Sequence, residues 1–228
     1  MSVAIITGAS RGLGRALARA LAERGWRLVI DARGADALEA ARAELVESTT
    51  TVAIAGDVTD ESHRRDLVAA AERLGAVDAV VNNAGILGPS PPPRLEALEA
   101  SSLRAIYEVN VLAPLGLCRL ALPALRVSSG CIVNVSSEAA VEAFASWGGY
   151  GSSKAALDHI SRVFALEHPE LRVYWVDPGD MNTEMEQQGF PDEDVSDRPS
   201  PLESVPGFLS LLEGRLPSGR YRSQHMDR

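Results

Sequence analysis

The amino-acid sequence predicts an α/β protein with a doubly wound parallel sheet of about seven strands and helices on both faces. Short β-branched runs alternate with longer stretches of helical periodicity from one end of the chain to the other. The strand runs are apolar throughout, as expected for strands that are buried on both faces. No linker interrupts this alternation, so we expect residues 1–228 to form a single domain.

Seven short apolar runs are the expected strands. They cover Val3–Thr7, Arg27–Asp31, Thr51–Gly56, Val77–Asn82, Cys131–Ser136, Leu171–Val176 and Ser218–Arg222. The intervening stretches rich in alanine, leucine and arginine are the expected helices. They cover Leu13–Arg24, Ala35–Glu47, Glu61–Leu74, about Leu95–Leu125 and Tyr150–His168. Because parallel strands need a crossover connection, this order predicts consecutive βαβ units.

Two segments break the alternation, and both follow strands. The prolines of Gly88–Pro93 exclude helix and strand alike. Asn182–Pro206 is polar, acidic and poor in apolar anchors, so we expect residues 182–206 to form a mobile lid over a bound ligand. Both segments should lie at the carboxyl edge of the sheet, where ligands bind in this class of fold.

The composition excludes several classes of protein. A net charge of −9 argues against binding to duplex nucleic acid, which requires a basic face. No apolar stretch approaches the ~20 uncharged residues of a membrane span. The first apolar run is short and lacks a basic segment before it, unlike a signal peptide. We therefore expect a cytoplasmic protein that is neither in a membrane nor on DNA.

Cysteines and histidines show no pattern of metal ligands, so we expect no metal site. Only Cys118 and Cys131 are present, and their spacing indicates neither a disulfide framework nor a zinc centre. The four histidines are scattered and are assigned to the surface; they are His63, His159, His168 and His225.

The segment Thr7–Gly14, with the sequence TGASRGLG, directly follows the first strand and opens the first helix. Small residues let the backbone approach a pyrophosphate, to which a helix N-terminus offers free N–H groups. Three glycines alone would also fit a tight strand–helix turn. Their place between a strand and a helix favours dinucleotide binding.

Further motifs follow in a characteristic order: Asn82-Asn83-Ala84-Gly85 after the fourth strand, and Tyr150-Gly-Ser-Ser-Lys154 at the start of a helix. With them the chain resembles the short-chain dehydrogenase/reductase family over roughly residues 3–222. The glycine spacing and the length resemble the shorter branch of that family. The resemblance implies a Rossmann-type fold and hydride transfer between a nicotinamide cofactor and a carbonyl or alcohol. Other matches are Asp57-Val58, Asn110, Ser136-Ser137, Pro178-Gly179 and Thr183.

Tyr150 and Lys154 are one helical turn apart, so their side chains share a face. A nearby ammonium favours phenolate, and the oxidised nicotinamide ring would add further positive charge. Together they should bring the tyrosine pKa from near 10 towards the working pH, as acid–base catalysis requires. A Tyr-x-x-x-Lys pair is also common on surfaces, but Lys154 is the only lysine of the chain. We therefore expect Tyr150 to exchange the proton with the substrate oxygen.

The resemblance implies two further catalytic residues. Ser137 would hydrogen-bond the substrate oxygen, while Ser136 should point to the opposite face of its strand. Asn110 would hold a water that links Lys154 to solvent in a proton relay. A serine that ends a strand can also be a cap, and Asn110 also fits as a polar helix residue that packing buries.

The resemblance also implies a cofactor site made of residues from these motifs. They are Gly8, Ser10, Arg11, Gly12, Leu13, Gly14, Ala32, Arg33, Asp57, Val58, Asn83, Ala84, Gly85, Tyr150, Lys154, Pro178, Gly179, Met181 and Thr183. By the spacing of the family from Gly14, the position that selects the cofactor is Ala32. Arg33 and Arg11 suit a 2′-phosphate, so NADPH (NADP⁺) is favoured. If the strand ends one residue earlier, Asp31 would hold the ribose and favour NADH (NAD⁺).

The substrate is expected to be a small ketone or aldehyde, or the corresponding alcohol. Phe144 and Trp147 are the expected apolar contacts, and Met185 is expected to line the pocket. Ala140 stands where the family more often has glycine, and the segment after Thr183 is short, so the substrate itself is not named.

Alternatives of other classes remain at this point. A cofactor-binding sensor without turnover would lack one of the catalytic residues, and all are present; an isomerase or dehydratase could use the same groups. A homodimer or homotetramer is expected because two helices carry more apolar residues than one sheet-facing stripe needs. Examples are Leu115, Leu122, Ala156 and Phe164. Internal packing of two broad faces would explain the same pattern.

Overall fold

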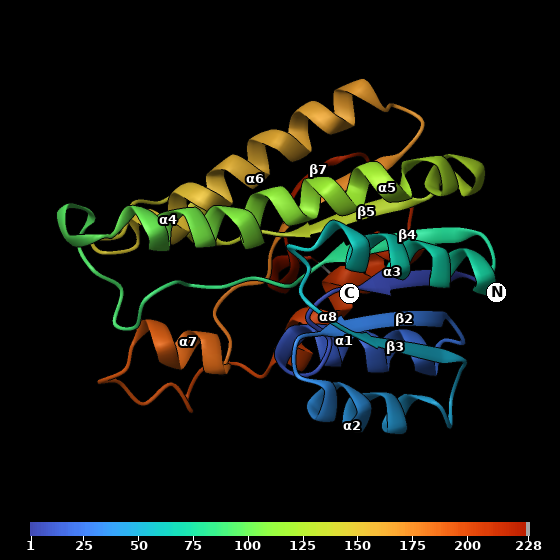
Figure 1. The fold of residues 1–228 in the computed structure, drawn as a ribbon, viewed down its shortest axis with the longest axis horizontal. Coiled ribbons are helices and arrows are strands. Elements are labelled where there is room, and N and C mark those ends of the chain that lie inside the picture. The colour runs from blue at the N-terminus through green and yellow to red at the C-terminus, as the bar shows by residue number, and fades with distance from the viewer. Residues whose placement is uncertain (227–228) are drawn as a thin grey trace.

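Seven parallel strands form one sheet in the order β3-β2-β1-β4-β5-β6-β7 (Figure 1). The computed structural model describes residues 1–226. The strands are β1 (Val3–Ile6), β2 (Arg27–Ala32), β3 (Thr51–Ala55), β4 (Val77–Asn82), β5 (Cys131–Val135), β6 (Arg172–Asp177) and β7 (Gly219–Arg222). The predicted fold class is confirmed. The strand order reverses between β1 and β4, which is where such sheets open a crevice.

Helices cover both faces of the sheet (Figure 1). On one face lie α1 (Gly12–Glu23), α2 (Ala35–Leu45) and α8 (Pro201–Glu213), and on the other α3 (Glu61–Leu74), α5 (Ala113–Ser128) and α6 (Gly148–Glu167). Successive residues of β1 point to opposite faces, as alternation requires. Ile6 packs with Leu17 and Phe208, whereas Ile5 packs with Leu67 and Leu117.

The predicted long helix from Leu95 to Leu125 is interrupted. It comprises a 3₁₀ turn (Leu95–Ala97), α4 (Ala100–Tyr107), a π-helical turn (Glu108–Leu112) and α5. The interruption before α4 arises because Leu98 and Glu99 have extended backbone. π-helical turns are frequent at functional sites, and this one contains Asn110.

The helical run Ala100–Ser128 contains an 18-residue window with a mean hydropathy of 1.4, enough by length and composition alone for a membrane span. Charged residues interrupt this run, and its longest uncharged stretch is Val109–Cys118. In the fold, however, α5 lies against the sheet with Leu117 and Leu125 buried. The run is apolar because it is a core helix.

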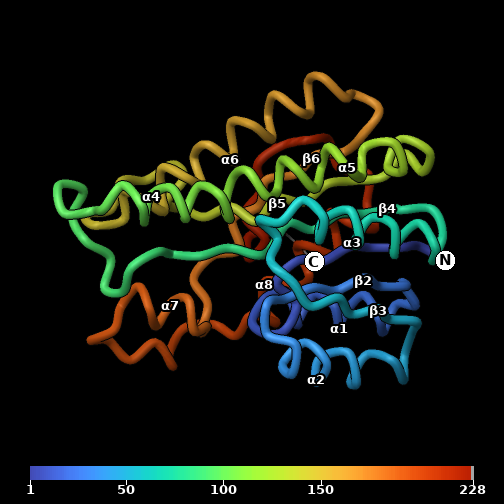
Figure 2. Tube along the Cα trace, viewed as in Figure 1, coloured from blue at the N-terminus to red at the C-terminus, as the bar shows by residue number. Residues whose placement is uncertain are grey.

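The segment predicted as a lid holds two helices. α7 (Glu184–Gly189) extends away from the sheet together with the loop that follows it (Figures 1 and 2). α8 begins at Pro201 with a capping box between Ser200 and Glu203. Its residues Val205 and Phe208 are buried in the core. Residues 201–206 of the predicted lid thus belong to a packed helix.

Candidate active site

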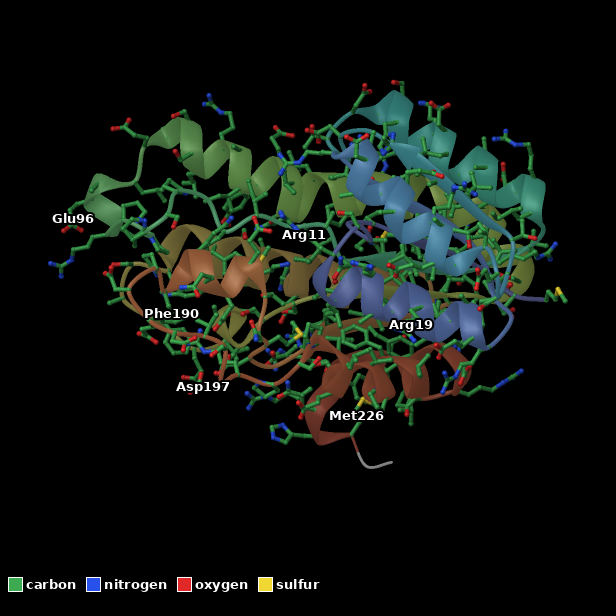
Figure 3. All side chains as sticks on the ribbon, turned by 90° about the horizontal axis from the view of Figure 1, so that it is seen from below. Arg11, Arg19, Glu96, Phe190, Asp197 and Met226 are labelled. Carbon is green, nitrogen blue, oxygen red and sulfur yellow. The ribbon has the colours of Figure 1, made fainter. Side chains whose placement is uncertain are left out.

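A cleft of about 1700 Å³ runs along the carboxyl ends of the strands. Figure 3 shows Arg11 at the start of α1, and Phe190 and Asp197 on the segment that follows β6. The cleft is lined by every residue predicted for the cofactor, the substrate and catalysis except Gly14 and Asn110. The structure therefore brings together side chains and backbone from loops far apart in the sequence.

The glycines of the first loop are required by close contacts. Gly8 has a φ of +66°, and a Cβ on it would lie 2.9 Å from the Cα of Ala84. Gly14 lies beneath the loop, where a Cβ would be 2.4 Å from the carbonyl oxygen of Gly8. Gly14 consequently supports the loop without lining the cleft.

The N-terminus of α1 faces the cleft with free donors. Arg11 is the N-cap residue but its side chain makes no capping bond, and the first turn holds no acidic residue. Unpaired N–H groups and the positive end of the helix dipole suit a pyrophosphate. The guanidinium of Arg11 pairs instead with Glu184 of α7, and both side chains are largely exposed. The described residues thus fit a dinucleotide.

Asp31 is buried behind the glycine loop. Its Oδ1 accepts a hydrogen bond of 2.8 Å from the Gly8 N–H, and its Oδ2 lies 3.0 Å from Nε2 of His63. Its carbonyl oxygen accepts from the Ala9 N–H at 2.9 Å. His63, expected at the surface, is 7% exposed because it forms this pair. The strand continues to Ala32, and Ala32 and Arg33 line the cleft.

The loop after β3 forms the next part of the wall. The Asp57 carboxylate accepts from the N–H and the hydroxyl of Thr59, each at 2.8 Å. The backbone hydrogen bond from Thr59 is the main cause that lowers the pKa of Asp57. Asp57 and Val58 line the cleft. Asp57 is therefore an anionic hydrogen-bond acceptor facing the cleft.

Tyr150 and Lys154 lie on the buried face of α6. Nζ of Lys154 donates to the carbonyl oxygen of Val135 at 2.7 Å and lies 5.6 Å from the centre of the Tyr150 ring. Ser137 has extended backbone and its Oγ accepts from the Ala139 N–H at 3.2 Å. Ser136 donates instead to Asp158, so the two serines diverge as alternation predicts.

Burial acts on Tyr150 and Lys154 in opposite directions because one is charged when deprotonated and the other when protonated. It raises the pKa of Tyr150, and a hydrogen bond with Ser137 only partly opposes this. It lowers the pKa of Lys154 to about 8, while Asp158 opposes the decrease. In the protein chain alone the pKa of Tyr150 therefore moves away from neutrality, opposite to the direction expected with the oxidised nicotinamide bound. At neutral pH the phenol keeps its proton.

Asn110 lies beside the catalytic residues. Its carboxamide accepts from the Ile86 N–H and donates to the Ile86 carbonyl, both at 2.9 Å, and donates to Ser153 at 3.0 Å. A Cβ on Gly85 would lie 3.3 Å from its Oδ1 and 3.7 Å from Nζ of Lys154. Asn110 thus links the backbone of Ile86, after β4, to Ser153 of α6.

The far end of the cleft has an aromatic wall. Trp147 meets the ring of Tyr150 edge-on at 5.8 Å and lies 5.3 Å from the ring of Phe190. Arg198 lies 4.4 Å above Phe190, with its Nη1 2.8 Å from Glu186. The sequence pattern did not single out these last three residues, because only their position after β6 connects them with the cleft. Phe144 and Met185 line the cleft as predicted.

Comparison with known proteins agrees with this site. A sequence profile described as short chain dehydrogenase matches residues 2–194. The chain belongs to the short-chain dehydrogenase/reductase family. Members of this family are NAD(P)-dependent oxidoreductases with a Rossmann-type fold, and the resemblance noted from the motifs is confirmed.

Individual relatives support the assignment over most of the chain. L-fucose dehydrogenase from Oryctolagus cuniculus is 36% identical over 192 residues, which are 82% of this chain and 65% of that protein. A short-chain dehydrogenase from Pseudomonas syringae superposes with a TM-score of 0.92 at 30% identity, covering 98% of this chain and 94% of that one. An alcohol dehydrogenase from Thermococcus sibiricus, complexed with 5-hydroxy-NADP, gives a TM-score of 0.88 at 30% identity, covering 100% and 99%.

Replacement of Tyr150 by Phe is expected to lower kcat by ~10²–10⁴-fold, because the ring still packs while the proton donor is lost. The dissociation constant of the cofactor, measured by fluorescence titration, should change little. Lys154→Arg should also lose most activity, because the bulkier guanidinium does not fit the buried position at Val135. A Tyr150→Phe variant that keeps more than about a tenth of the wild-type rate would contradict the acid–base assignment.

Proposed function

We propose that the chain reduces a small ketone or aldehyde to the alcohol with NADPH. The observation that carries this proposal is the buried Tyr150, which retains its proton beside Lys154 and Ser137 in the cleft. A general acid that is protonated at neutral pH suits the reducing direction. The same groups can run the reaction in reverse from an alcohol.

The proposed roles follow from the contacts of each side chain. Ser137 donates a hydrogen bond to the carbonyl oxygen of the substrate, and Tyr150 gives that oxygen its proton. The ammonium of Lys154, held by the Val135 carbonyl, stabilises the phenolate that remains on Tyr150. Asn110 continues the relay from Lys154 towards solvent. The nicotinamide cofactor, when bound, supplies the hydride.

Besides Ala32 and Arg33 at the end of β2 and Tyr150 and Lys154 of α6, the residues proposed to hold the cofactor come from four loops. The glycine loop and the N-terminus of α1 take the pyrophosphate, and Asp57-Val58 contacts the adenine. The nicotinamide end of the site is formed by two loops. One contains Asn83–Gly85, and the other contains Pro178-Gly179, Met181 and Thr183. The substrate would lie against Trp147 and Phe144, which line the same cleft.

The proposed reaction can be tested with purified protein and a panel of carbonyl compounds and alcohols. Oxidation of NADPH should accompany reduction of at least one ketone or aldehyde, with the alcohol identified as product. Cofactor binding without turnover of any compound would favour a cofactor-binding sensor. Conversion of a substrate without net change of the cofactor would favour an isomerase or dehydratase.

The preference for NADPH over NADH is supported by the second strand. A carboxylate at its end would bind both ribose hydroxyls and repel a 2′-phosphate, but that position is Ala32. The carboxylate of Asp31 is engaged by Gly8 and His63. Arg33 is exposed at the cleft. Arg11, the other arginine expected at the 2′-phosphate, pairs with Glu184. The preference therefore depends mainly on Arg33.

Arg33→Ala is expected to weaken NADPH binding by about 10-fold or more, because a charge-assisted contact to phosphate is worth roughly 1.5–3 kcal/mol. NADH binding should be unchanged, because NADH lacks the 2′-phosphate. Dissociation constants for both cofactors, measured with the wild type and the variant, provide the test. An exposed arginine of α3 that does not line the cleft, Arg65→Ala, is the control. Tighter NADH binding in the wild type, unaffected by Arg33→Ala, would contradict the proposal.

We further propose that the segment from Asn182 to Ser200 is the mobile part of a substrate lid, hinged on the packed helix α8. Most of its side chains are exposed, although Val195 is buried. Few apolar anchors mean a low cost of local opening. Limited proteolysis should therefore cut within residues 182–200 in the ligand-free protein, and NADPH with substrate should suppress the cuts. Equal cutting with and without ligands would contradict a lid.

We also propose a cytoplasmic homodimer or homotetramer. α4 and α6 pack side by side. Exposed apolar residues lie on α6 (Val163 and Leu166), on the π-helical turn (Leu112) and on α5 (Val127). Three of the residues first considered do not contribute, because Phe164 is buried and both Leu115 and Leu122 pack against the core. Light scattering at micromolar concentration should give at least twice the monomer mass, since exposed apolar surface favours association. A monomer mass would contradict this assembly.

A further inference from the structure

Two arginines of the last strand reach towards the catalytic edge of the sheet. β7 pairs with β6 so that Arg220 lies beside Trp175 and Arg222 beside Asp177. Arg220 and Arg222 are two residues apart in a strand, so their side chains share a face. The side chain of Arg220 is 24% exposed, and that of Asp177 is 2% exposed. The sequence motifs of the family include neither arginine.

Arg220 contacts the backbone of the residue that is proposed to bind the substrate oxygen. Its Nη2 donates to the carbonyl oxygen of Ser137 at 2.9 Å, and its Nε donates to Oδ2 of Asp158 at 3.2 Å. The hydroxyl of Ser136 donates to the other oxygen of Asp158. Ser136 and Ser137, which follow β5, are therefore both hydrogen-bonded to the Arg220–Asp158 pair.

The contacts continue to the neighbouring loop. Oδ2 of Asp177 lies 3.6 Å from Nη2 of Arg220 and 3.2 Å from Nε of Arg222. Its other oxygen accepts from the Gly179 N–H at 3.0 Å. Arg222 also donates to Glu138 at 2.9 Å. The two arginines thus connect the loop after β5 with the loop after β6.

Removal of Arg220 would leave these partners unsatisfied. The carbonyl of Ser137 would lose its donor, and two buried carboxylates, Asp158 and Asp177, would lose a cation. Breaking one partner out of a buried charge pair is costly, because the other charge remains away from water. The backbone at Ser137 would then be expected to rearrange, and displacement of a reacting group by ~1 Å can cost ~10²-fold in rate.

We propose that Arg220 is a positioning residue that holds Ser137 in place for its hydrogen bond to the substrate oxygen. This inference rests on the proposed function, because the effect on rate requires Ser137 to contact the reacting carbonyl. The competing view is that Arg220 only fastens β7 to the sheet. The two views differ in whether catalysis or stability alone responds to its removal.

Arg220→Met keeps the length and packing of the side chain but removes the charge and the donors. We expect kcat to fall by about 10–100-fold, with the KM for NADPH and its dissociation constant within about twofold of the wild type. Arg220→Lys, which keeps the charge, should recover part of kcat. Arg172→Met is the matched control, because Arg172 donates to the Gly214 carbonyl at the opposite end of β6. It should lower the melting temperature without lowering kcat.

An Arg220→Met variant with kcat within twofold of the wild type and a lower melting temperature would overturn the proposal. So would equal losses of kcat in Arg220→Met and Arg172→Met. Crystal structures of the wild type and Arg220→Met with NADPH give a readout that does not depend on turnover. Displacement of Ser137 in the variant is expected, and an unmoved Ser137 would overturn the proposal. Absence of turnover in the wild type would count against the proposed function alone.

Discussion

The cleft exists because the strand order reverses between β1 and β4, and side chains tie the two sides of that reversal together. The hydroxyl of Thr7 accepts from the N–H groups of Asn83 and Ala84, each at 3.0 Å. The amide of Asn83 donates back to the carbonyls of Thr7 and Gly8 at 2.9 and 3.1 Å. The glycine loop and the loop after β4 are therefore fixed relative to each other.

The side of the cleft that contains Tyr150 and Lys154 meets a different constraint, which is the burial of charge. Lys154 is 4% exposed. Its buried ammonium is stabilised because it donates a hydrogen bond to the Val135 carbonyl and lies near the opposite charge of Asp158. Asp158 is in turn neutralised by Arg220 from the last strand. Buried charges are tolerated when they are paired and hydrogen-bonded. Through Arg220, β7 thus contributes to the charge balance around Lys154, although it contributes no residue to the recognised motifs.

Local pattern was sufficient for the strands and for the motif residues that line the cleft. Periodicity identifies strands, and the carboxyl ends of parallel strands necessarily meet at one edge, which brings the motifs together. The start of α8 could also have been found, because Ser200 and Glu203 have capping-box spacing. The acidic segment before α8 led to an expected loop that ended at Pro206, whereas α8 begins at Pro201. The extended backbone at Leu98-Glu99 and the π-helical turn at Asn110 have no compositional signal, so one long helix was expected.

Side-chain contacts between elements that are distant in the sequence could not be predicted. These contacts determine whether a residue binds a ligand or supports the fold. Asp31 stands beside the cofactor-selecting position and could have been taken for a ribose ligand. It is fully buried, and an unpaired carboxylate there would cost several kcal/mol. The Gly8 N–H and His63 compensate that cost, and no local pattern relates His63 to a strand 32 positions away. Turning the carboxylate towards a ribose would break both contacts at once. Burial and these two partners therefore hold the Asp31 carboxylate at the glycine loop.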